Sequence, residues 1–135
     1  MPHIEQIPAH LTWKIRHQAL YPNSEWGKAI LENDEEGLHL GLFDENELRS
    51  VVSLFWEEHD LQFRKFATLP AFQNKGYGSA LVNYLLDFAL QEQNTRVWRN
   101  ARRSASHFYR RFGFPETEIT FYSNDEHFVV MEKFL

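Results

Sequence analysis

Residues 73–80 have the composition and spacing of a site that binds anions through its backbone. They follow an apolar run, residues 61–69, that predicts a strand, and they open an amphipathic run that predicts a helix. The first N–H groups of a helix have no partner within the helix and point along its axis. Gly76 and Gly78 allow positive φ and close approach of a ligand, and Lys75 adds a positive charge. The segment therefore predicts a ligand with phosphate groups.

Two familiar phosphate-binding motifs do not fit the spacing of this loop. A dinucleotide-binding G-x-G-x-x-G needs a third glycine at the position of Leu81. A Walker A loop ends in Gly-Lys-Ser/Thr, whereas Gly78 is followed by Ser79 and Ala80. A pair of glycines alone is also compatible with a tight turn that binds nothing. From the loop itself, both interpretations remain open.

Length and composition predict a single globular domain over residues 1–135, large enough to bury its own core. The apolar fraction of 43% argues against disorder. With no Cys, the chain offers no disulfide framework and no thiol nucleophile, and its seven His show no spacing typical of metal ligands, so we expect no metal site. No apolar run is long enough to span a membrane, and the amino terminus does not resemble a signal peptide. We therefore expect a cytoplasmic protein without a membrane partner.

Charge along the chain is uneven. The net charge of −5 argues against a nucleic-acid partner, because a basic face supplies most of that affinity. Six arginines nevertheless fall within residues 96–111, namely Arg96, Arg99, Arg102, Arg103, Arg110 and Arg111. A solvated helix face is one explanation. A basic pocket in an acidic protein would suit a small polyanionic cofactor better than a polymer.

The elements that must position these residues follow from hydrophobic periodicity and turn residues. We expect helices over residues 8–20, 76–93 and 104–112, the last closed by Gly113 in the left-handed conformation. We expect strands over residues 37–43, 48–56, 61–68, 95–98, 116–122 and 126–135, and leave residues 26–36 unassigned. This order predicts an α/β (α+β) fold with a mixed, mostly antiparallel twisted sheet and helices on both faces.

Two segments together resemble the GNAT superfamily of coenzyme A-dependent N-acyltransferases. Residues 73–78 match its Q/R-x-x-G-x-G/A pyrophosphate loop, with Pro70 where many members carry a proline. Residues 100–114 resemble its N-A-R…A-x-x-F-Y-x-x-x-G-F segment, and the distance between the two motifs is typical. The similarity covers residues 48–114 well. Residues 16–22, 39–41 and 127–131 are similar to a bacterial subgroup of the superfamily.

The resemblance implies that acetyl-coenzyme A is the cofactor. It would lie where two parallel strands, residues 61–68 and 95–99, splay apart to form a cleft. Backbone groups freed by the splay would bind the pantetheine arm, and the N–H groups of the loop would hold the pyrophosphate. The implied cofactor residues are Phe66, Ala67, Thr68, Gln73, Asn74, Lys75, Gly76, Tyr77, Gly78, Ser79, Asn100 and Tyr109.

Tyr109 stands at the tyrosine position of the family motif, so the resemblance implies that it is the general acid. The leaving thiolate, with a pKa of about 8.5, benefits from a nearby proton donor, and a phenol with a pKa of about 10 is protonated at neutral pH. A core tyrosine without a catalytic role remains the alternative.

The acceptor amine must also lose a proton. A lysine-like amine with a pKa of about 10.4 is neutral about once in 2,500 molecules at pH 7, and an α-amine with a pKa of about 7.8 about once in seven. The need for a base therefore depends on the acceptor. Where some members carry a catalytic Glu, this chain has Gln62, which cannot act as a base. Ordered water and four side chains remain as alternatives: Glu57, Glu58, His59 and His127. We favour His127, because histidine is the side-chain type whose ordinary pKa lies nearest to neutrality and this one precedes an apolar strand.

Substrate-side residues are suggested by analogy with the subgroup: Arg16, His39, Arg64, Trp98 and Arg102. Period-2 alternation predicts that Arg64 shares a strand face with Gln62 and Phe66. Arginine in a cleft would suit an acceptor with a carboxylate or phosphate group. Each of these residues could equally be structural.

The sequence thus predicts an N-acyltransferase, with acetyl as the expected group, that acts on a primary amine of a small molecule or peptide. A non-catalytic acyl-coenzyme A-binding sensor or scaffold is the alternative. A nucleotide-binding domain is disfavoured, because the loop matches neither the dinucleotide-binding glycine motif nor the Walker A motif. Monomer and homodimer both remain compatible with the sequence.

Overall fold

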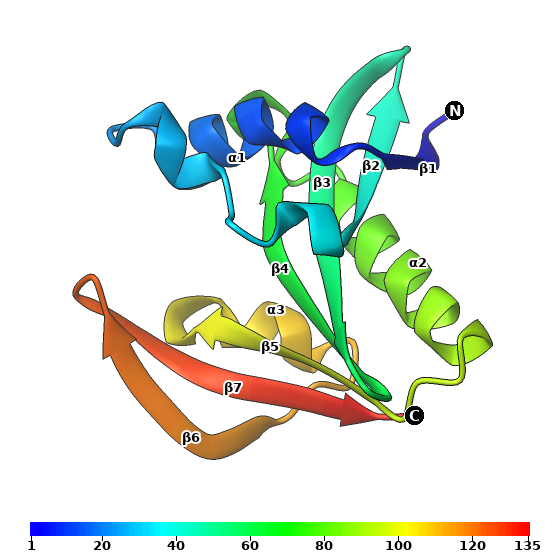
Figure 1. Cartoon of the computed structure of the whole chain (residues 1–135), viewed down its shortest axis with the longest axis vertical. Helices are drawn as coiled ribbons and strands as arrows, with labels where there is room; N and C mark the ends of the chain where they lie inside the picture. Colours follow the sequence, from blue (N-terminus) through cyan, green and yellow to red (C-terminus); the bar gives the residue numbers. More distant parts are fainter. The chain divides into compact units, whose positions relative to one another are not determined.

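The computed structural model describes all 135 residues and combines one sheet with three α-helices (Figure 1). The helices are α1 (Trp13–Leu20), α2 (Tyr77–Gln91) and α3 (Ser106–Arg110). The strands are β1 (His3–Ile7), β2 (Leu38–Asp44), β3 (Glu47–Glu57), β4 (Asp60–Thr68), β5 (Arg96–Arg102), β6 (Glu116–Ser123) and β7 (Glu126–Phe134). The sheet has seven strands in the order β1-β2-β3-β4-β5-β7-β6. Every neighbouring pair with a described register is antiparallel except β4 and β5, which confirms the expected mixed, mostly antiparallel sheet.

Four elements differ from the sequence prediction. The expected helix at residues 8–20 is a 3-10 turn over Ala9–Thr12 followed by α1. Strand β1 was not expected, because only Ile7 of its five residues is buried and the segment has no apolar alternation. The expected strand at residues 95–98 continues to Arg102. The expected helix at residues 104–112 is shorter, a 3-10 turn over Arg103–Ala105 followed by α3. Residues 26–36 contain two 3-10 turns, Trp26–Ala29 and Asp34–Glu36.

The chain divides into two compact units, each described below by itself. Unit 1 comprises residues 1–55 and 63–84, and unit 2 comprises residues 56–62 and 85–135. The single domain expected from chain length stays a prediction. None of the helices is both long and apolar enough to cross a membrane.

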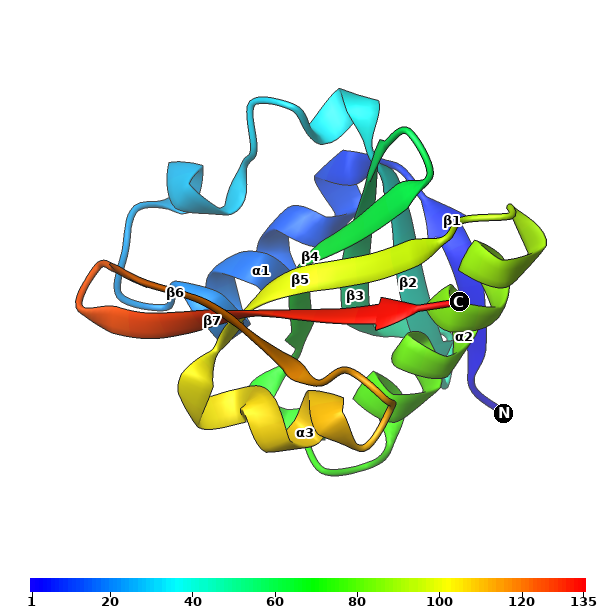
Figure 2. The same ribbon diagram turned by 90° about the horizontal axis from the view of Figure 1, so that it is seen from below.

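Unit 1 is built around the central strand β3. Residues Ser50 to Leu54 of this strand are all fully buried, so both of its faces must be covered. Figures 1 and 2 show α1 and the beginning of α2 on opposite sides of β2 and β3. On the α1 side, Ile15 packs with Val51, Ala67 and Ile7 in an apolar cluster.

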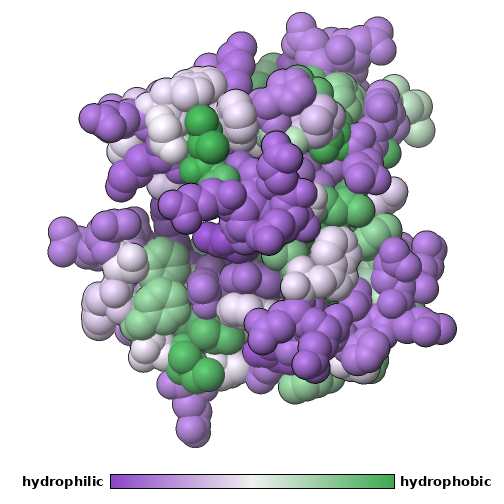
Figure 3. All heavy atoms as spheres, viewed as in Figure 1, coloured by the Kyte–Doolittle hydropathy of each residue, from purple (hydrophilic) through white to green (hydrophobic).

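Unit 2 contains the parallel pair and the carboxy-terminal hairpin. Strand β5 runs parallel to the start of β4, with Leu61 opposite Val97, and antiparallel to β7, with Ala101 opposite Val129. Val97, Ala101 and Val129 are buried. The edge strand β6 is mostly exposed, and apolar side chains gather over the β6–β7 hairpin on the surface shown in Figure 3.

Candidate active site

The glycine loop of unit 1 leads directly from β4 into α2, as the sequence predicts. A 3-10 turn over Pro70–Phe72 follows β4, and the chain then passes through two left-handed residues, Asn74 (φ 63°) and Gly76 (φ 84°). Gly78, also expected to use positive φ, lies instead in the first turn of α2. A Cβ added at Gly76 would meet nothing within 4 Å, so the backbone here faces open space.

Four consecutive N–H groups at this open position have no acceptor in the chain. They belong to Gly76, Tyr77, Gly78 and Ser79, whereas Ala80 donates to the Gly76 carbonyl at 3.1 Å and begins the helical ladder. Unpartnered donors at a helix amino terminus, together with the positive end of the helix dipole, favour an anion. The local geometry therefore fits a pyrophosphate.

The loop is anchored to the β2–β3 hairpin by contacts at both of its ends. The Leu69 N–H donates to the Arg49 carbonyl at 3.0 Å, and the Arg49 guanidinium lies 3.7 Å from the centre of the Phe72 ring. At the other end, the Tyr77 hydroxyl donates to Asp44 Oδ2 at 2.5 Å. These contacts hold the loop in place without using the four N–H groups.

Strand β4 changes the direction of its side chains at Lys65, which has a positive φ of 51°. The rings of Phe63 and Phe66 contact each other at 6.5 Å, while Arg64 lies over Phe55 at 5.7 Å. Strict alternation predicted that Arg64 and Phe66 share a face, and that prediction is wrong. The left-handed residue acts as a β-bulge does and resets the alternation.

The carboxy-terminal end of β4 carries Ala67 and Thr68, which were expected to bind the pantetheine arm through their backbone. The Ser50 hydroxyl donates to the Ala67 carbonyl at 3.1 Å and lies 2.8 Å from the Thr68 hydroxyl. The Gln73 side-chain amide donates to the Thr68 carbonyl at 3.2 Å. Each carbonyl has a second lone pair, so these bonds fix the strand end and leave acceptor capacity.

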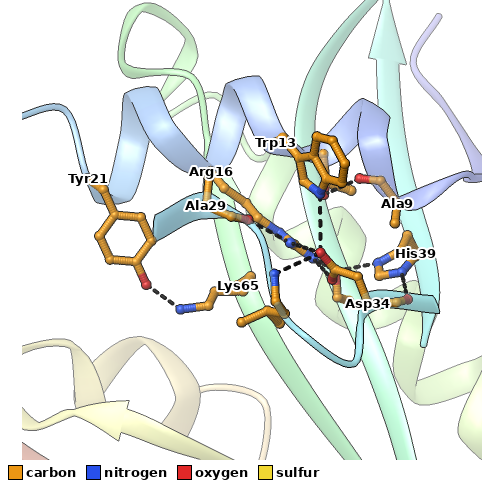
Figure 4. A network of polar contacts seen from close by, with 11 residues as sticks. Ala9, Trp13, Arg16, Tyr21, Ala29, Asp34, His39 and Lys65 are labelled. Carbon is orange, nitrogen blue, oxygen red and sulfur yellow. Dashed lines mark hydrogen bonds and ion pairs between the residues drawn. The ribbon is translucent and has the colours of Figure 1, made fainter. Parts of the chain in front are cut away.

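Arg16 and His39, expected on the substrate side, are buried in the interior of unit 1 (Figure 4). Arg16 is 0% exposed, and both its terminal nitrogens donate to the Asp34 carboxylate at 2.9 Å. It also donates to the Ala29 carbonyl and the Ser53 hydroxyl. The expectation for these two residues is corrected: a cation removed from water needs anionic and hydrogen-bonding partners, and Arg16 finds them within the chain.

His39 completes this network. Its Nε2 lies 2.8 Å from the Asp34 carbonyl and must donate, because a carbonyl only accepts. In the neutral ring, Nδ1 then accepts from the Ser53 hydroxyl at 2.7 Å. Burial acts to raise the pKa of Asp34, but hydrogen bonds from Arg16, the Leu31 N–H and Trp13, with the Arg16 charge, hold that pKa below its ordinary value. The network fastens residues 29–34 to the sheet.

Tyr109 lies on α3 in unit 2 and is buried, with 7% of its surface exposed. The Arg99 guanidinium lies 4.7 Å from the centre of its ring. Burial raises the pKa of the phenol above its ordinary value, and the charges of Arg99 and Arg102 act in the opposite direction. The phenol is therefore protonated at neutral pH, as a general acid requires. Unit 2 thus brings the expected acid together with two of the arginines noted in the sequence.

The other expected residues of unit 2 lie on β5 and β7. Asn100 and Trp98 are half-buried neighbours on β5, opposite Val130 and Glu132 of β7. Arg102 ends β5, is exposed, and lies 3.9 Å from Glu126. His127 stacks on Tyr122 across the hairpin at 4.5 Å.

Sequence reasoning missed the roles of Lys65 and Asp34 in unit 1, and it named Asn74 without foreseeing its backbone conformation. The left-handed conformation of Asn74 could have been predicted, because asparagine tolerates it and here precedes Lys-Gly. Lys65 gave no such signal, since lysine has no preference for positive φ. Asp34 lies eighteen residues from Arg16 and in a different element, a 3-10 turn rather than α1, so the pair becomes visible only in the fold.

Comparison with known proteins agrees with this geometry. A model of the Acetyltransferase (GNAT) family matches residues 4–114. The "Uncharacterized N-acetyltransferase YitI" of Bacillus subtilis is 27% identical over 125 residues, which are 86% of this chain and 84% of that protein. Four further curated relatives are longer, and the chain spans 56 to 59% of their length.

Solved structures show the same fold. The ribosomal-protein-S18-alanine N-acetyltransferase of Escherichia coli superposes with a TM-score of 0.83 at 18% identity, covering 99% of this chain and 94% of that one. A GNAT family acetyltransferase of Elizabethkingia anophelis with acetyl-CoA bound superposes with a TM-score of 0.76 at 17% identity, covering 99% and 98%. With the family model matching more than half of the residues, the chain belongs to the Acetyltransferase (GNAT) family, whose members bind acetyl-coenzyme A.

Proposed function

We propose that the chain transfers an acetyl group from acetyl-coenzyme A to a primary amine of a small molecule or peptide. The observation that carries this proposal is the row of unpartnered N–H groups from Gly76 to Ser79, at a glycine whose Cβ position is open. Such a row suits a pyrophosphate and belongs to a loop that matches the family motif. Family membership supports acetyl as the group transferred.

In unit 1, the loop N–H groups would hold the pyrophosphate and the exposed Lys75 would add positive charge. The backbone of Phe66, Ala67 and Thr68 would hydrogen-bond the pantetheine amides. In unit 2, Asn100 is the proposed contact of the pantetheine arm. The thioester supplies an acetyl carbonyl activated for attack.

Tyr109 is the proposed general acid. As the amine nitrogen bonds to the acetyl carbon and the carbon–sulfur bond breaks, the phenol O–H would give its proton to the sulfur. Because the pKa of Tyr109 is raised, its phenol still carries this proton when the reaction begins. The proton lost by the amine would pass to a base, for which His127 is the proposed residue.

Thermal unfolding with and without acetyl-coenzyme A tests the donor half of the proposal. A ligand at about a hundredfold excess over its Kd stabilises the folded state by about 2.7 kcal/mol. We therefore expect the melting temperature to rise by several degrees. No shift at millimolar acetyl-coenzyme A would overturn the proposal.

Turnover of a panel of amines, measured by release of the coenzyme A thiol, tests the catalytic half. Tyr109→Phe should keep the thermal shift but lower kcat by about a hundredfold, the low end for loss of a general acid. Tyr84→Phe, at an exposed position of α2, is the matched control and should leave kcat unchanged. Unchanged turnover in Tyr109→Phe would remove the tyrosine as the acid. A thermal shift with no turnover on any amine would favour a non-catalytic sensor.

A further inference from the structure

Two cations stand next to each other on one face of β4. In a regular strand, consecutive side chains point to opposite faces, so Arg64 and Lys65 would separate. The left-handed conformation at Lys65 removes this separation. Arg64 lies over Phe55, and Lys65 points toward Tyr21 at the end of α1 (Figure 4). Both side chains therefore lie on the face that α1 covers.

Neither cation has a carboxylate within 4 Å, although both are half-buried. Lys65 Nζ lies 4.8 Å from the centre of the Tyr21 ring and donates a hydrogen bond to the Tyr21 hydroxyl oxygen. Arg64 contacts the Phe55 ring. Aromatic rings hold cations in place through their electron-rich faces, but they do not neutralise the charge.

Other arginines of unit 1 do have a carboxylate partner, and Arg16 is the first example. It lies on the same side of the sheet, and the Asp34 carboxylate satisfies its charge with two hydrogen bonds. Arg49 likewise has Glu47 at 3.5 Å. Two adjacent like charges, partly removed from water and without a counter-charge, repel each other. A bound anion would relieve that repulsion.

The Tyr21 hydroxyl adds a third group to the pair. Its oxygen accepts from Lys65, and its own hydrogen makes no hydrogen bond in the chain. A phenol can donate and accept at once. Tyr21 can therefore position Lys65 and donate to the same anion.

The position of the pair along β4 indicates which ligand would carry the anion. The glycine loop follows the carboxy-terminal end of β4, and Phe66 to Thr68 lie between it and Lys65. On the proposed function, the pantetheine arm runs back along these residues from the loop. The pair then lies just beyond the acetyl end of the donor, where the acceptor must arrive.

We propose that Arg64, Lys65 and Tyr21 form an anion subsite, and that the acceptor is a small amine that also carries a carboxylate or a phosphate. This inference rests on the proposed function for the identity of the ligand. It goes beyond that function because it assigns a chemical class to the acceptor. Such a subsite would offer an anion three donors: a guanidinium, an ammonium and a hydroxyl.

Paired acceptors test the inference. Acetyl transfer is measured with α-amino acids and β-alanine, each beside its amide, and with phosphoethanolamine beside ethanolamine. The carboxylate and phosphate arms distinguish the two kinds of anion. In the best pair we expect kcat/KM to be about tenfold to a hundredfold higher for the anionic amine, the range of a charge-assisted hydrogen bond. The preference should fall to about one in the double variant Arg64→Gln, Lys65→Asn.

The second substitution is chosen to preserve the strand. Asparagine adopts the left-handed conformation more readily than most residues, so Lys65→Asn removes the charge and keeps the bulge. Lys14→Gln, at an exposed position on α1, is the matched control and should leave the preference unchanged. The thermal shift with acetyl-coenzyme A should be the same in all variants. Equal kcat/KM for anionic and neutral amines would overturn the subsite while leaving the proposed function intact.

A binding measurement decides the case in which no amine is turned over. Calorimetry with succinate and with inorganic phosphate, on protein saturated with acetyl-coenzyme A, should detect binding in the natural sequence and its loss in the double variant. Absence of binding of either anion would overturn the subsite. Failure of the proposed function would instead appear as absence of the acetyl-coenzyme A thermal shift.

Discussion

The glycine loop and the cationic face of β4 lie at opposite ends of one stretch of unit 1 and are built from different atoms. The loop offers backbone N–H groups of Gly76 to Ser79, and the residue that its backbone constrains most is Gly76, which has a positive φ. The face around Arg64 and Lys65 offers side-chain charges. A site made of backbone leaves a glycine motif in the sequence, whereas a site made of side chains leaves only residues that are common elsewhere in the chain.

The same contrast separates two kinds of arginine. Arg16 and Arg64 look alike in the sequence, and both were expected near the substrate. In the fold, Arg16 is fully buried and bound to Asp34, and Arg64 has only an aromatic neighbour. Whether an arginine is structural or available depends on a partner that is distant in sequence. The structure identifies that partner, whereas the sequence does not.

The largest expected effect comes from breaking the buried pair. Asp34→Ala leaves the Arg16 guanidinium uncompensated in the interior, which costs about 3–5 kcal/mol for a buried ion pair. Urea unfolding measures the loss, and Glu35→Ala, at the exposed neighbouring position, serves as the control. A loss of unfolding free energy below about 1 kcal/mol would mean that water reaches Arg16. Arg16 and Arg64 would then not differ in the way described above.

The next effect tests the backbone site. Gly76→Glu places a carboxylate where the pyrophosphate would sit, and like charges in contact cost several kcal/mol, so we expect Kd for acetyl-coenzyme A to rise at least about a hundredfold. The positive φ adds strain for any residue with a Cβ. Isothermal titration measures Kd. Gly27→Glu, at a glycine with no positive φ and open space, is the control and should bind normally.

If both Gly76→Glu and the control bound acetyl-coenzyme A alike, the loop would not hold the pyrophosphate. Gly76→Ala separates the two causes of the effect, because it introduces the backbone strain without the charge. It should lower the free energy of unfolding by about 1–2 kcal/mol and leave most of the affinity for acetyl-coenzyme A.

The sequence predicted those parts of the fold that depend on local chemistry. The strand–loop–helix around Gly76, the closing role of Gly113 (φ 88°) and the β6–β7 hairpin were all expected and are present. Each is indicated by a glycine or by the regular spacing of apolar residues within a short segment. The fold class followed from the order of these elements.

The parts that could not be predicted depend on contacts between distant residues or on strain. Period-2 alternation placed Arg64 with Phe66 because it assumes a regular strand, and Lys65 breaks that regularity without a sequence signal. The environment of Arg16 required its partner eighteen residues away. Strand β1 is recognisable only by its pairing with β2.

The smallest expected effect compares two carboxylates of unit 1, Asp44 at the loop anchor and Asp34 in the buried Arg16 network. The Tyr77 hydroxyl bond is the main cause that lowers the pKa of Asp44, and it raises the pKa of Tyr77 itself. Asp34 also has a lowered pKa, although its burial opposes the shift. A carboxyl whose pKa is lower in the folded state adds stability above its unfolded pKa, near 4, and loses that stability as pH falls through the folded value.

Carboxyl titration by NMR measures both groups in one experiment. Tyr77→Phe should return the pKa of Asp44 toward its ordinary value and leave that of Asp34 unchanged. Between about pH 5 and pH 3, stability should fall less steeply in Tyr77→Phe than in the natural sequence, and less steeply still in Asp34→Asn, which removes the buried carboxyl. A larger change in slope from Tyr77→Phe than from Asp34→Asn would mean that the part-buried loop anchor, and not the buried pair, dominates the acid sensitivity of unit 1.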